Sequence, residues 1–368
     1  MENKTLIVII LIIVILAGGI IFFKESLKKS PVTNLQECKT LKFNNEKAFN
    51  ILFFSEKGIA EKNMQYFLNS EPYVNSQNAF NFYYIDDYTP VCELYKGIAL
   101  YCHSRDLVKK AASCPNDYIV VLQKQGNSIR SSAYQNVISI NSEHPLSTLL
   151  HEFAHVFAGL DDEYVPATIG FMSKNCLSSC DKFDVSDGCF EGCGEDKYFR
   201  SIDAGLMRTL STRDYGKFDK GIINSILEKR SASNSKITGN VIINEYCNNQ
   251  KYYLVIGKIV NGSIEIIDKS LEIGCASGAP NVGQYNYSVL DENGGKIIQT
   301  PINAEMIYTD IQPEGAEIIE GGANVSDKEF ILTVPFVDQP LKLRIENNSG
   351  QILSETNLEG LNNLACKI

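Results

Sequence analysis

The chain has 368 residues, of which 44% are apolar and 21% charged, and its net charge at neutral pH is -10. This is the composition of a folded globular protein long enough for two hydrophobic cores, and it excludes a largely disordered chain. The acidic balance and the lack of a basic cluster beyond residues 24–29 argue against a nucleic-acid partner. The sequence also contains no phosphate-binding loop and no dinucleotide fingerprint.

The first element in chain order is an apolar segment at residues 5–23, which carries no charge and is long enough to span a bilayer. A cleavable signal peptide is the alternative, since the small residues 17–19 could follow a short apolar region, but the apolar run continues beyond them. We therefore expect residues 1–30 to form an uncleaved membrane anchor with a short stalk. The lysines that follow the segment favour a cytoplasmic location for the rest of the chain.

The cysteines favour the opposite side of the membrane. There are 11 of them, far more than a cytosolic hydrolase normally carries, which indicates an oxidising compartment, several disulfides and one cysteine left over. Weaker support comes from N-glycosylation sequons at Asn261, Asn286, Asn324 and Asn347. Because long domains cross membranes largely regardless of flanking charge, we predict a single-pass protein of the cell membrane with an extracellular body.

Strand-like apolar runs then alternate with helical stretches. We expect strands at 51–54, 80–85, 118–122 and 136–140, and helices around 58–69 and 104–112. Such alternation predicts an α/β layer.

A helix is expected over about 145–158. Pro145 suits a first helical position, leucines and phenylalanines form an apolar stripe, and Gly159 is a natural C-terminal stop. A turn at this glycine would bring the acidic residues that follow back towards the helix.

This helix carries the motif around which the chain is organised. His151 and His155 are four residues apart, so both imidazoles lie on one face and can reach a single metal ion. Glu152 lies one step around the helix, where its carboxylate can take a proton from a metal-activated water. The spacing predicts a hydrolytic zinc site. The other two histidines, His103 and His144, have no such spacing and are expected to be ordinary residues.

The pattern H-E-x-x-H-x-x-x-G-L-x-D-E-Y, at residues 151–164, resembles the zinc motif of the immunoglobulin-A peptidase family of metzincin-like zinc metallo-endopeptidases. Residues 49–54 and 81–86 are loosely similar to that family's opening strands, and residues 205–208 are similar to its Met-turn. The resemblance covers about residues 45–230.

The resemblance implies one Zn²⁺ as cofactor, with His151 and His155 as ligands and Glu152 as general base. It also implies that Met207 lies beneath the metal as a packing base.

The third ligand is open between two aspartates. The resemblance favours Asp162, the aspartate of D-E-Y. Metzincins usually place the glycine three residues and the third ligand six residues after the second histidine, however. Here Gly159 is four residues after His155, and spacing alone would favour Asp161. Because either carboxylate suits zinc, chemistry does not decide between them.

Two supporting features are also expected. Glu163 and Arg208 could form a buried ion pair behind the site, since an ionised glutamate close to the metal needs a partner. By analogy with metzincin-like peptidases, the strand at 136–140 is expected to be an edge strand that pairs with extended substrate.

Four cysteines between the zinc motif and Met207 form two closely spaced pairs, Cys176 with Cys180 and Cys189 with Cys193. Two disulfides are expected here if the domain is extracellular, and a structural zinc is the alternative. Spacing does not determine the pairing.

From residue 236 the pattern changes to β-branched runs separated by turn signals. We expect three hairpins, at 252–271, 285–300 and 341–355. They predict a sandwich over 236–368, whose role could be that of a passive spacer or of a binding module.

The predicted architecture is thus an α+β (α/β-layered), metzincin-like zinc peptidase domain at 31–232, followed by an all-β sandwich and preceded by a transmembrane helix. The expected function is that of a membrane-anchored extracellular zinc endopeptidase acting on proteins or peptides, with substrate and oligomeric state left open. One alternative is a non-catalytic cell-surface adhesion or binding module on a degenerate peptidase fold. Another is a hydrolase of non-peptide amides.

Overall fold

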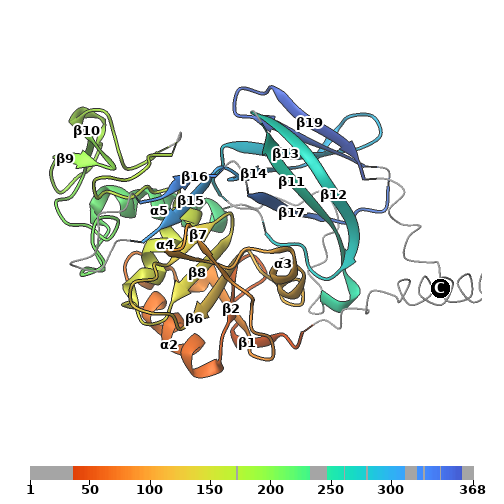
Figure 1. Cartoon of the computed structure of the whole chain (residues 1–368), viewed down its shortest axis with the longest axis horizontal. Helices are drawn as coiled ribbons and strands as arrows, with labels where there is room; N and C mark the ends of the chain where they lie inside the picture. The colour runs from red at the N-terminus through yellow and green to blue at the C-terminus, as the bar shows by residue number, and fades with distance from the viewer. Residues whose placement is uncertain are drawn as a thin grey trace, which may run out of the picture. The chain divides into compact units, whose positions relative to one another are not determined.

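The computed structural model describes most of the chain beyond residue 35 (Figure 1). The described ranges are 36–170, 173–232, 247–260, 262–278, 281–310, 321–325, 328–339 and 341–358. The predicted membrane segment at 5–23 lies outside them. Among the residues inside these ranges, no helix is long and apolar enough to cross a membrane.

Eight strands form one mixed sheet. They are β1 (Lys39–Lys42), β2 (Phe49–Phe54), β3 (Phe80–Ile85), β6 (Tyr118–Gln123), β7 (Ser132–Tyr134), β8 (Val137–Asn141), β15 (Met306–Thr309) and β16 (Ala323–Asn324). Their order is β1-β3-β2-β6-β8-β7-β15-β16. Neighbours among β3, β2, β6 and β8 run parallel, and β7 is antiparallel to β8. Strands β2 and β3 are almost entirely buried, as expected for strands covered on both faces.

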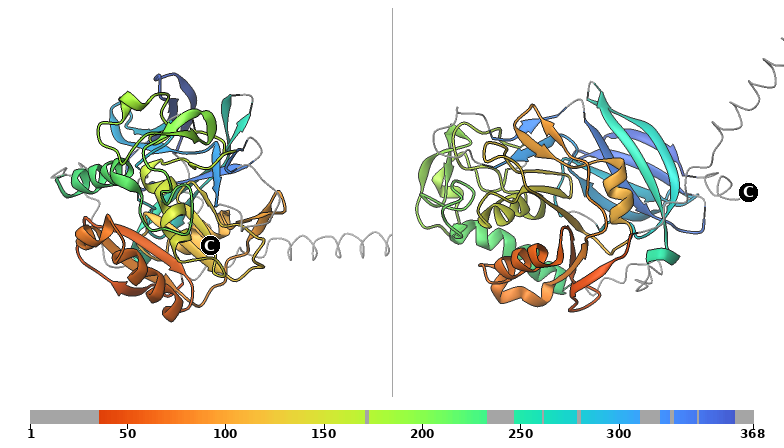
Figure 2. Two further views of the ribbon diagram at one scale, coloured as in Figure 1. Left: turned by 90° about the vertical axis from the view of Figure 1, so that its left-hand side faces the viewer. Right: turned by 60° about the horizontal axis from the view of Figure 1, so that its bottom comes forward.

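Helices cover both faces of this sheet. They are α2 (Lys57–Leu68), α3 (Arg105–Ala111), α4 (Ser147–Ala158) and α5 (Gly216–Ala232). Apolar residues of α2, α4 and α5 share one core with alternate residues of β2, β3 and β6, and α2 and α5 lie together on this side (Figure 2). Helix α3 packs on the opposite face. The predicted α/β layering is confirmed.

Shorter elements complete this region. They are the 3₁₀ helices η1 (Tyr73–Ala79) and η2 (Cys180–Lys182) and the antiparallel pairs β4 (Glu93–Tyr95) with β5 (Ala99–Tyr101) and β9 (Phe190–Cys193) with β10 (Glu195–Arg200). A third 3₁₀ helix, η3 (Cys247–Asn249), lies at the start of the region that follows.

Two antiparallel sheets follow and enclose a second core. One contains β11 (Lys251–Val260), β12 (Ser263–Ile273) and β17 (Glu329–Pro335); the other contains β13 (Tyr285–Leu290), β14 (Lys296–Ile302), β18 (Lys342–Asn347) and β19 (Ile352–Asn357). The pairs β11–β12, β13–β14 and β18–β19 are the three expected hairpins. Inward-facing residues of both sheets share one hydrophobic cluster, which is the arrangement of a sandwich.

The segment between β14 and β17 departs from the expected separation of the two regions. Strands β15 and β16 leave the antiparallel sheets and extend the mixed sheet beyond β7. By its contacts the chain from Gln36 onward forms one unit. The domain limits 31–232 and 236–368 remain predictions, but the second region contributes strands to the sheet of the first.

The expectation that the strand at 136–140 lies at a sheet edge is wrong. That strand is β8, which pairs with β6 on one side and with β7 on the other. The short strand β7 follows β8 in the sheet order, and its outer side is covered by β15.

Five disulfides join ten cysteines of the described residues. They are Cys38–Cys114, Cys92–Cys102, Cys176–Cys193, Cys180–Cys189 and Cys247–Cys275. The four loop cysteines form two nested disulfides, which excludes the structural-zinc alternative in that loop. The remaining cysteine, Cys366, lies outside the described residues. Disulfides in this number are typical of proteins exposed to an oxidising, extracellular environment.

Candidate metal centre

The end of α4 turns the chain back over the helix. Gly159 adopts a left-handed conformation with φ of 68°, which glycine adopts without strain. Its N–H donates to the His155 carbonyl at 3.0 Å, and Leu160 is fully buried in the core beyond the turn. The helix begins at Ser147, two residues later than expected, and ends at Ala158 as expected.

Three side chains converge beside α4. The Nε2 atoms of His151 and His155 are 3.2 Å apart, and Asp162 Oδ1 lies 3.1 Å from the first and 3.4 Å from the second. Ligand atoms placed tetrahedrally around zinc at 2.0–2.1 Å are about 3.3–3.4 Å from one another. The triangle therefore has the size that a single zinc ion requires, and these residues could bind a metal ion.

Backbone carbonyls orient both imidazoles. The Nδ1 atom of His151 donates to the Leu206 carbonyl at 3.0 Å, and that of His155 donates to the Leu160 carbonyl at 2.6 Å. Because Nδ1 carries the hydrogen in these bonds, each neutral ring presents the lone pair of Nε2 to the centre, as a metal ligand must. Burial lowers the pKa of both rings. At His151 the hydrogen bond and charge of Asp162 outweigh burial and raise the pKa to about 9, whereas the pKa of His155 stays lowered.

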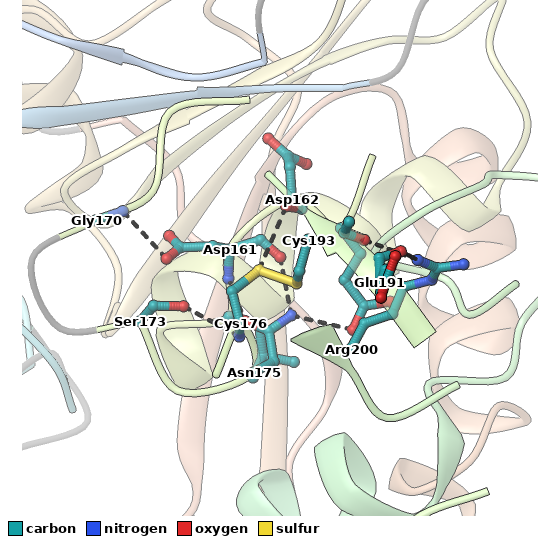
Figure 3. The surroundings of a disulfide bond; sticks show 12 residues. Asp161, Asp162, Gly170, Ser173, Asn175, Cys176, Glu191, Cys193 and Arg200 are labelled. Atoms are coloured by element: carbon teal, nitrogen blue, oxygen red, sulfur yellow. Dashed lines mark hydrogen bonds between the residues drawn. A yellow bond between two sulfur atoms is a disulfide. The ribbon is translucent and has the colours of Figure 1, made fainter. Parts of the chain in front are cut away.

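A polar clamp holds the segment that carries Asp162. The Asn175 side chain accepts a hydrogen bond from the Asp161 N–H at 2.8 Å and donates to the Asp161 carbonyl at 2.9 Å (Figure 3). The next residue, Cys176, forms the disulfide to Cys193, and its sulfur lies 3.7 Å from the Asp162 carbonyl oxygen. The disulfide loop thus supports the backbone of the segment that carries Asp162.

The structure distinguishes the two candidate aspartates. The Asp162 carboxylate faces both histidines; although burial raises its pKa, their charges and hydrogen bonds bring it well below the usual range. The Asp161 carboxylate instead accepts a hydrogen bond from the Gly170 N–H at 3.1 Å and bonds with two hydroxyl groups. Burial raises the pKa of Asp161 to about 7. Asp162 is therefore the aspartate of the cluster, and Asp161 stabilises the loop.

Glu152 is fully buried on the same helix. Neither of its carboxylate oxygens has a hydrogen-bond partner among the described residues. Burial raises its pKa well above the ordinary value; the charge of His151 opposes this shift, and those of Asp310 and Asp162 reinforce it. Because an unpartnered buried carboxyl is costly, its position beside three residues that could bind a metal ion indicates a functional group.

The expected ion pair between Glu163 and Arg208 is not formed. Glu163 Oε1 accepts a weak hydrogen bond from Asn175 at 3.4 Å, and Oε2 has no partner among the described residues. Burial raises the pKa of Glu163 to about 8. The charge of half-buried Arg208 lowers this pKa but does not offset the effect of burial. Asp219 on α5 is also fully buried, and burial together with the charge of Glu163 raises its pKa well above the ordinary value. Burial thus raises the pKa of both of these core carboxyl groups.

Met207 lies in a turn that supports both the helix and the aspartate loop. Its side chain is fully buried in the core shared with α4. Its carbonyl accepts a hydrogen bond from the Glu163 N–H at 2.8 Å, and the preceding carbonyl of Leu206 is the acceptor for His151. The backbone of this turn is therefore hydrogen-bonded both to His151 and to the segment that carries Asp162. The role of Met207 as a packing base beneath the metal stays a prediction.

Tyr308 on β15 is a neighbour of the centre that the sequence did not indicate. Its ring stacks on the His155 imidazole with 4.2 Å between centroids and 10° between planes. Its hydroxyl hydrogen-bonds with the Asp161 carboxylate. Because Tyr308 belongs to the second half of the chain and follows a run of hairpin-like strands, no local pattern connects it with the zinc motif.

A buried charged cluster follows β15. Asp310 lies 2.7 Å from His144 Nδ1, and one of its oxygens is 3.8 Å from Arg130 Nε. Arg130 donates to the Tyr164 hydroxyl at 3.2 Å, and this hydroxyl donates to the Thr309 carbonyl at 2.9 Å. The tyrosine of the D-E-Y motif is thus linked to β15.

His144→Gln tests this cluster through the pH dependence of stability. Burial lowers the pKa of His144, but the hydrogen bond and charge of Asp310 outweigh burial and raise it above the ordinary value. A raised folded-state pKa means that the stabilisation is fully present below the unfolded value of about 6.5 and is lost as pH rises through the folded value. We expect the variant to be less stable at pH 5.5, by about 1 kcal/mol or less because solvent partly screens the ring, and nearly equal to wild type at pH 9. Urea denaturation at both pH values measures this difference, and a difference independent of pH would contradict the assignment.

His103, like His144, lies outside the metal cluster, as expected for both. It packs edge-on against Tyr134 with 5.0 Å between ring centroids, and burial lowers its pKa to about 4. Neither histidine belongs to the metal-binding group of the described residues.

Comparison with known proteins adds no assignment, since no protein-family model and no curated protein matches the chain. The chemistry of the centre is therefore inferred from its own geometry. Two imidazoles and one carboxylate could hold a divalent metal ion. The buried, unpartnered Glu152 beside them could accept a proton.

Proposed function

We propose that this protein is a zinc-dependent endopeptidase of the metzincin-like, immunoglobulin-A-peptidase type. His151, His155 and Asp162 would hold the zinc ion, and Glu152 would act as general base. The observation that carries the proposal is the triangle of ligand atoms, with sides of 3.1–3.4 Å, beside the unpartnered Glu152 on the same helix. Three protein ligands leave a fourth position free, which is typical of a catalytic and not a structural zinc site.

Each residue has a distinct part in hydrolysis of a peptide bond. Zinc bound at the triad would supply a Lewis acid that polarises the scissile carbonyl and makes water acidic at neutral pH. Glu152 takes the proton from the attacking water and delivers it to the leaving amine nitrogen. Burial raises the pKa of Glu152 above its ordinary value, and a higher pKa makes its carboxylate a stronger proton acceptor in the first step.

We further propose an extracellular location with attachment through the N-terminal segment. The five disulfides support an oxidising compartment, and the uncharged run at 5–23 would supply the anchor. The expected partner is a protein or peptide substrate, and the acidic composition argues against nucleic acid.

Removal of the metal tests the function. Incubation of the full chain with a peptide library should generate new peptide ends, detected by mass spectrometry, and pretreatment with a zinc chelator should abolish them. Adding back about one equivalent of zinc should restore cleavage, because the described triad provides one centre. Cleavage that survives with no bound metal would contradict the proposal. A protein that binds zinc but cleaves nothing, in any variant, would favour the non-catalytic binding module.

A further inference from the structure

We propose that β15 is a pseudo-substrate strand: a segment of the chain's own second half that occupies the substrate position along β7, so that the peptidase cleaves only while this strand is transiently displaced. This inference rests on the proposed function. It assigns a regulatory role to the region that the sequence left open between spacer and binding module.

The first observation is the pairing of β15. It lies antiparallel to β7, with Ile307 opposite Tyr134, Tyr308 opposite Ala133 and Thr309 opposite Ser132. Extended peptides commonly bind to proteins by adding a strand to a sheet edge in this manner. Because β8 covers the inner side of β7, the outer side is where an added strand can pair, and every residue of β7 is paired there with β15.

The second observation is the side chain that β15 directs to the centre. Tyr308 stacks on the ring of His155, a proposed zinc ligand, and its hydroxyl bonds with Asp161 of the motif loop. The backbone one residue later is held by the Tyr164 hydroxyl at 2.9 Å from the Thr309 carbonyl oxygen. The zinc motif itself therefore binds β15 through both side-chain and backbone contacts.

The third observation is the burial of the centre. His151, Glu152 and His155 are 0% exposed and Asp162 is 1% exposed. A polypeptide cannot reach a group that no solvent reaches, so some segment must move before a protein substrate is cleaved. Strand β15 is the segment that covers the outer side of β7 and stacks on a zinc ligand, and its contact with β7 is only three residues long.

A cavity lies next to the centre, and displacement of β15 would connect the two. It has a volume of about 260 Å³, and its walls include Gly159, Asp161, Lys174 and Tyr308. Tyr308 thus contacts the cavity as well as the ring of His155. Displacement of β15 would remove this side chain and open the cavity to the metal, leaving the edge of β7 free for an extended peptide.

A reversible cross-link tests the proposal. Ser132 and Thr309 are directly opposite each other, and both are small and buried. Because successive side chains of a strand point to opposite faces of the sheet, Ser132 and Thr309 lie on the other face from Ala133 and Tyr308. A disulfide between Ser132→Cys and Thr309→Cys would therefore hold β15 on β7 without altering the side chains at the centre. The two single variants are matched controls, and wild type given the same mild reductant controls for the native disulfides.

Two readouts are measured in the zinc-loaded full chain, namely the rate of zinc transfer to a chelator and the rate of peptide cleavage. We expect the cross-linked protein to slow both at least tenfold relative to the single variants, and reduction to restore both. The proposal would be overturned if the cross-linked variant had the same rate of zinc transfer and the same rate of cleavage as the single variants. Strand β15 would then stay in place during turnover, and substrate and chelator would reach the metal by another route.

A second pair of variants removes the stacked ring. Tyr308→Ala should accelerate zinc transfer to the chelator severalfold, and Tyr308→Phe, which keeps the ring, should stay near wild type. Hydrogen exchange of the β15 amides should be faster in Tyr308→Ala alone. If zinc transfer responds as expected but no variant cleaves peptide, the proposed peptidase function fails while β15 remains the cover of the centre. If zinc transfer is unchanged and the cross-linked variant cleaves peptide as fast as wild type, the pseudo-substrate proposal fails alone.

Discussion

Glu152→Gln is expected to bind zinc as wild type does and to lose at least a thousandfold in kcat for peptide cleavage. Glutamine has the size of glutamate but can neither accept the proton of the attacking water nor return it to the leaving nitrogen, and each role is worth about 10²–10⁴-fold. Zinc binding is spared because Glu152 is not a member of the ligand triangle. Zinc content by elemental analysis and kcat with a fluorogenic peptide, in the same preparations, measure the two effects.

Glu143→Gln is the matched control, because Glu143 is an exposed carboxylate that pairs with Lys124 at the surface. It should keep both zinc and activity. Cleavage by zinc-loaded Glu152→Gln at more than a tenth of the wild-type rate would remove Glu152 from the mechanism. Loss of zinc from that variant would instead show that the carboxylate is a ligand.

Asp162→Ala is expected to weaken zinc binding by more than about 100-fold, whereas Asp161→Ala should weaken it by about 10–100-fold at most. Loss of a group outside the ligand shell typically costs about 10–100-fold in affinity at most, and removal of a ligand costs more. Asp162 faces both histidines, while Asp161 bonds with the Gly170 N–H and the Tyr308 hydroxyl.

Competition with a chromophoric chelator measures both affinities. Asp161→Asn is the control, since it keeps the size of the side chain and part of its hydrogen bonding and should remain within a few fold of wild type. A larger loss in Asp161→Ala than in Asp162→Ala would assign the third ligand to Asp161 and contradict the described geometry.

The local features of the site could be predicted from the sequence because they depend on helical geometry and on turn residues. The four-residue spacing of His151 and His155 places both on one face of any helix, and Gly159 ends the helix where it was expected to. The hairpins of the second half were also predictable, since turn signals such as Asn261-Gly262 separate their strands.

The features that depend on distant contacts could not be predicted. The choice of Asp162 over Asp161 follows from the clamp by Asn175 and the Cys176–Cys193 disulfide, which no spacing rule contains. The ion pair expected between Glu163 and Arg208 is not formed; burial raises the pKa of Glu163, and its Oε1 accepts a hydrogen bond from Asn175 instead.

The largest difference between the predicted and the observed structure concerns the strands around the centre. Strand β7 has three residues, too few to give a periodic signal, so the sequence predicts only the longer β8 and does not show that β7 lies outside it in the sheet. Strand β15 arrives from a region that reads as a separate all-β module, and pairing between distant strands leaves no local pattern. The sequence therefore did not predict that β15 lies over the centre, although Tyr164, whose hydroxyl donates to the Thr309 carbonyl of β15, belongs to the zinc motif.

X-ray absorption at the zinc edge of the loaded full chain tests the central claim most directly. The account predicts one zinc per chain with only nitrogen and oxygen ligands at about 2.0–2.1 Å, and loss of this signal in His155→Ala. Sulfur ligands at about 2.3 Å, or an unchanged spectrum in His155→Ala, would contradict the assignment of zinc to His151, His155 and Asp162.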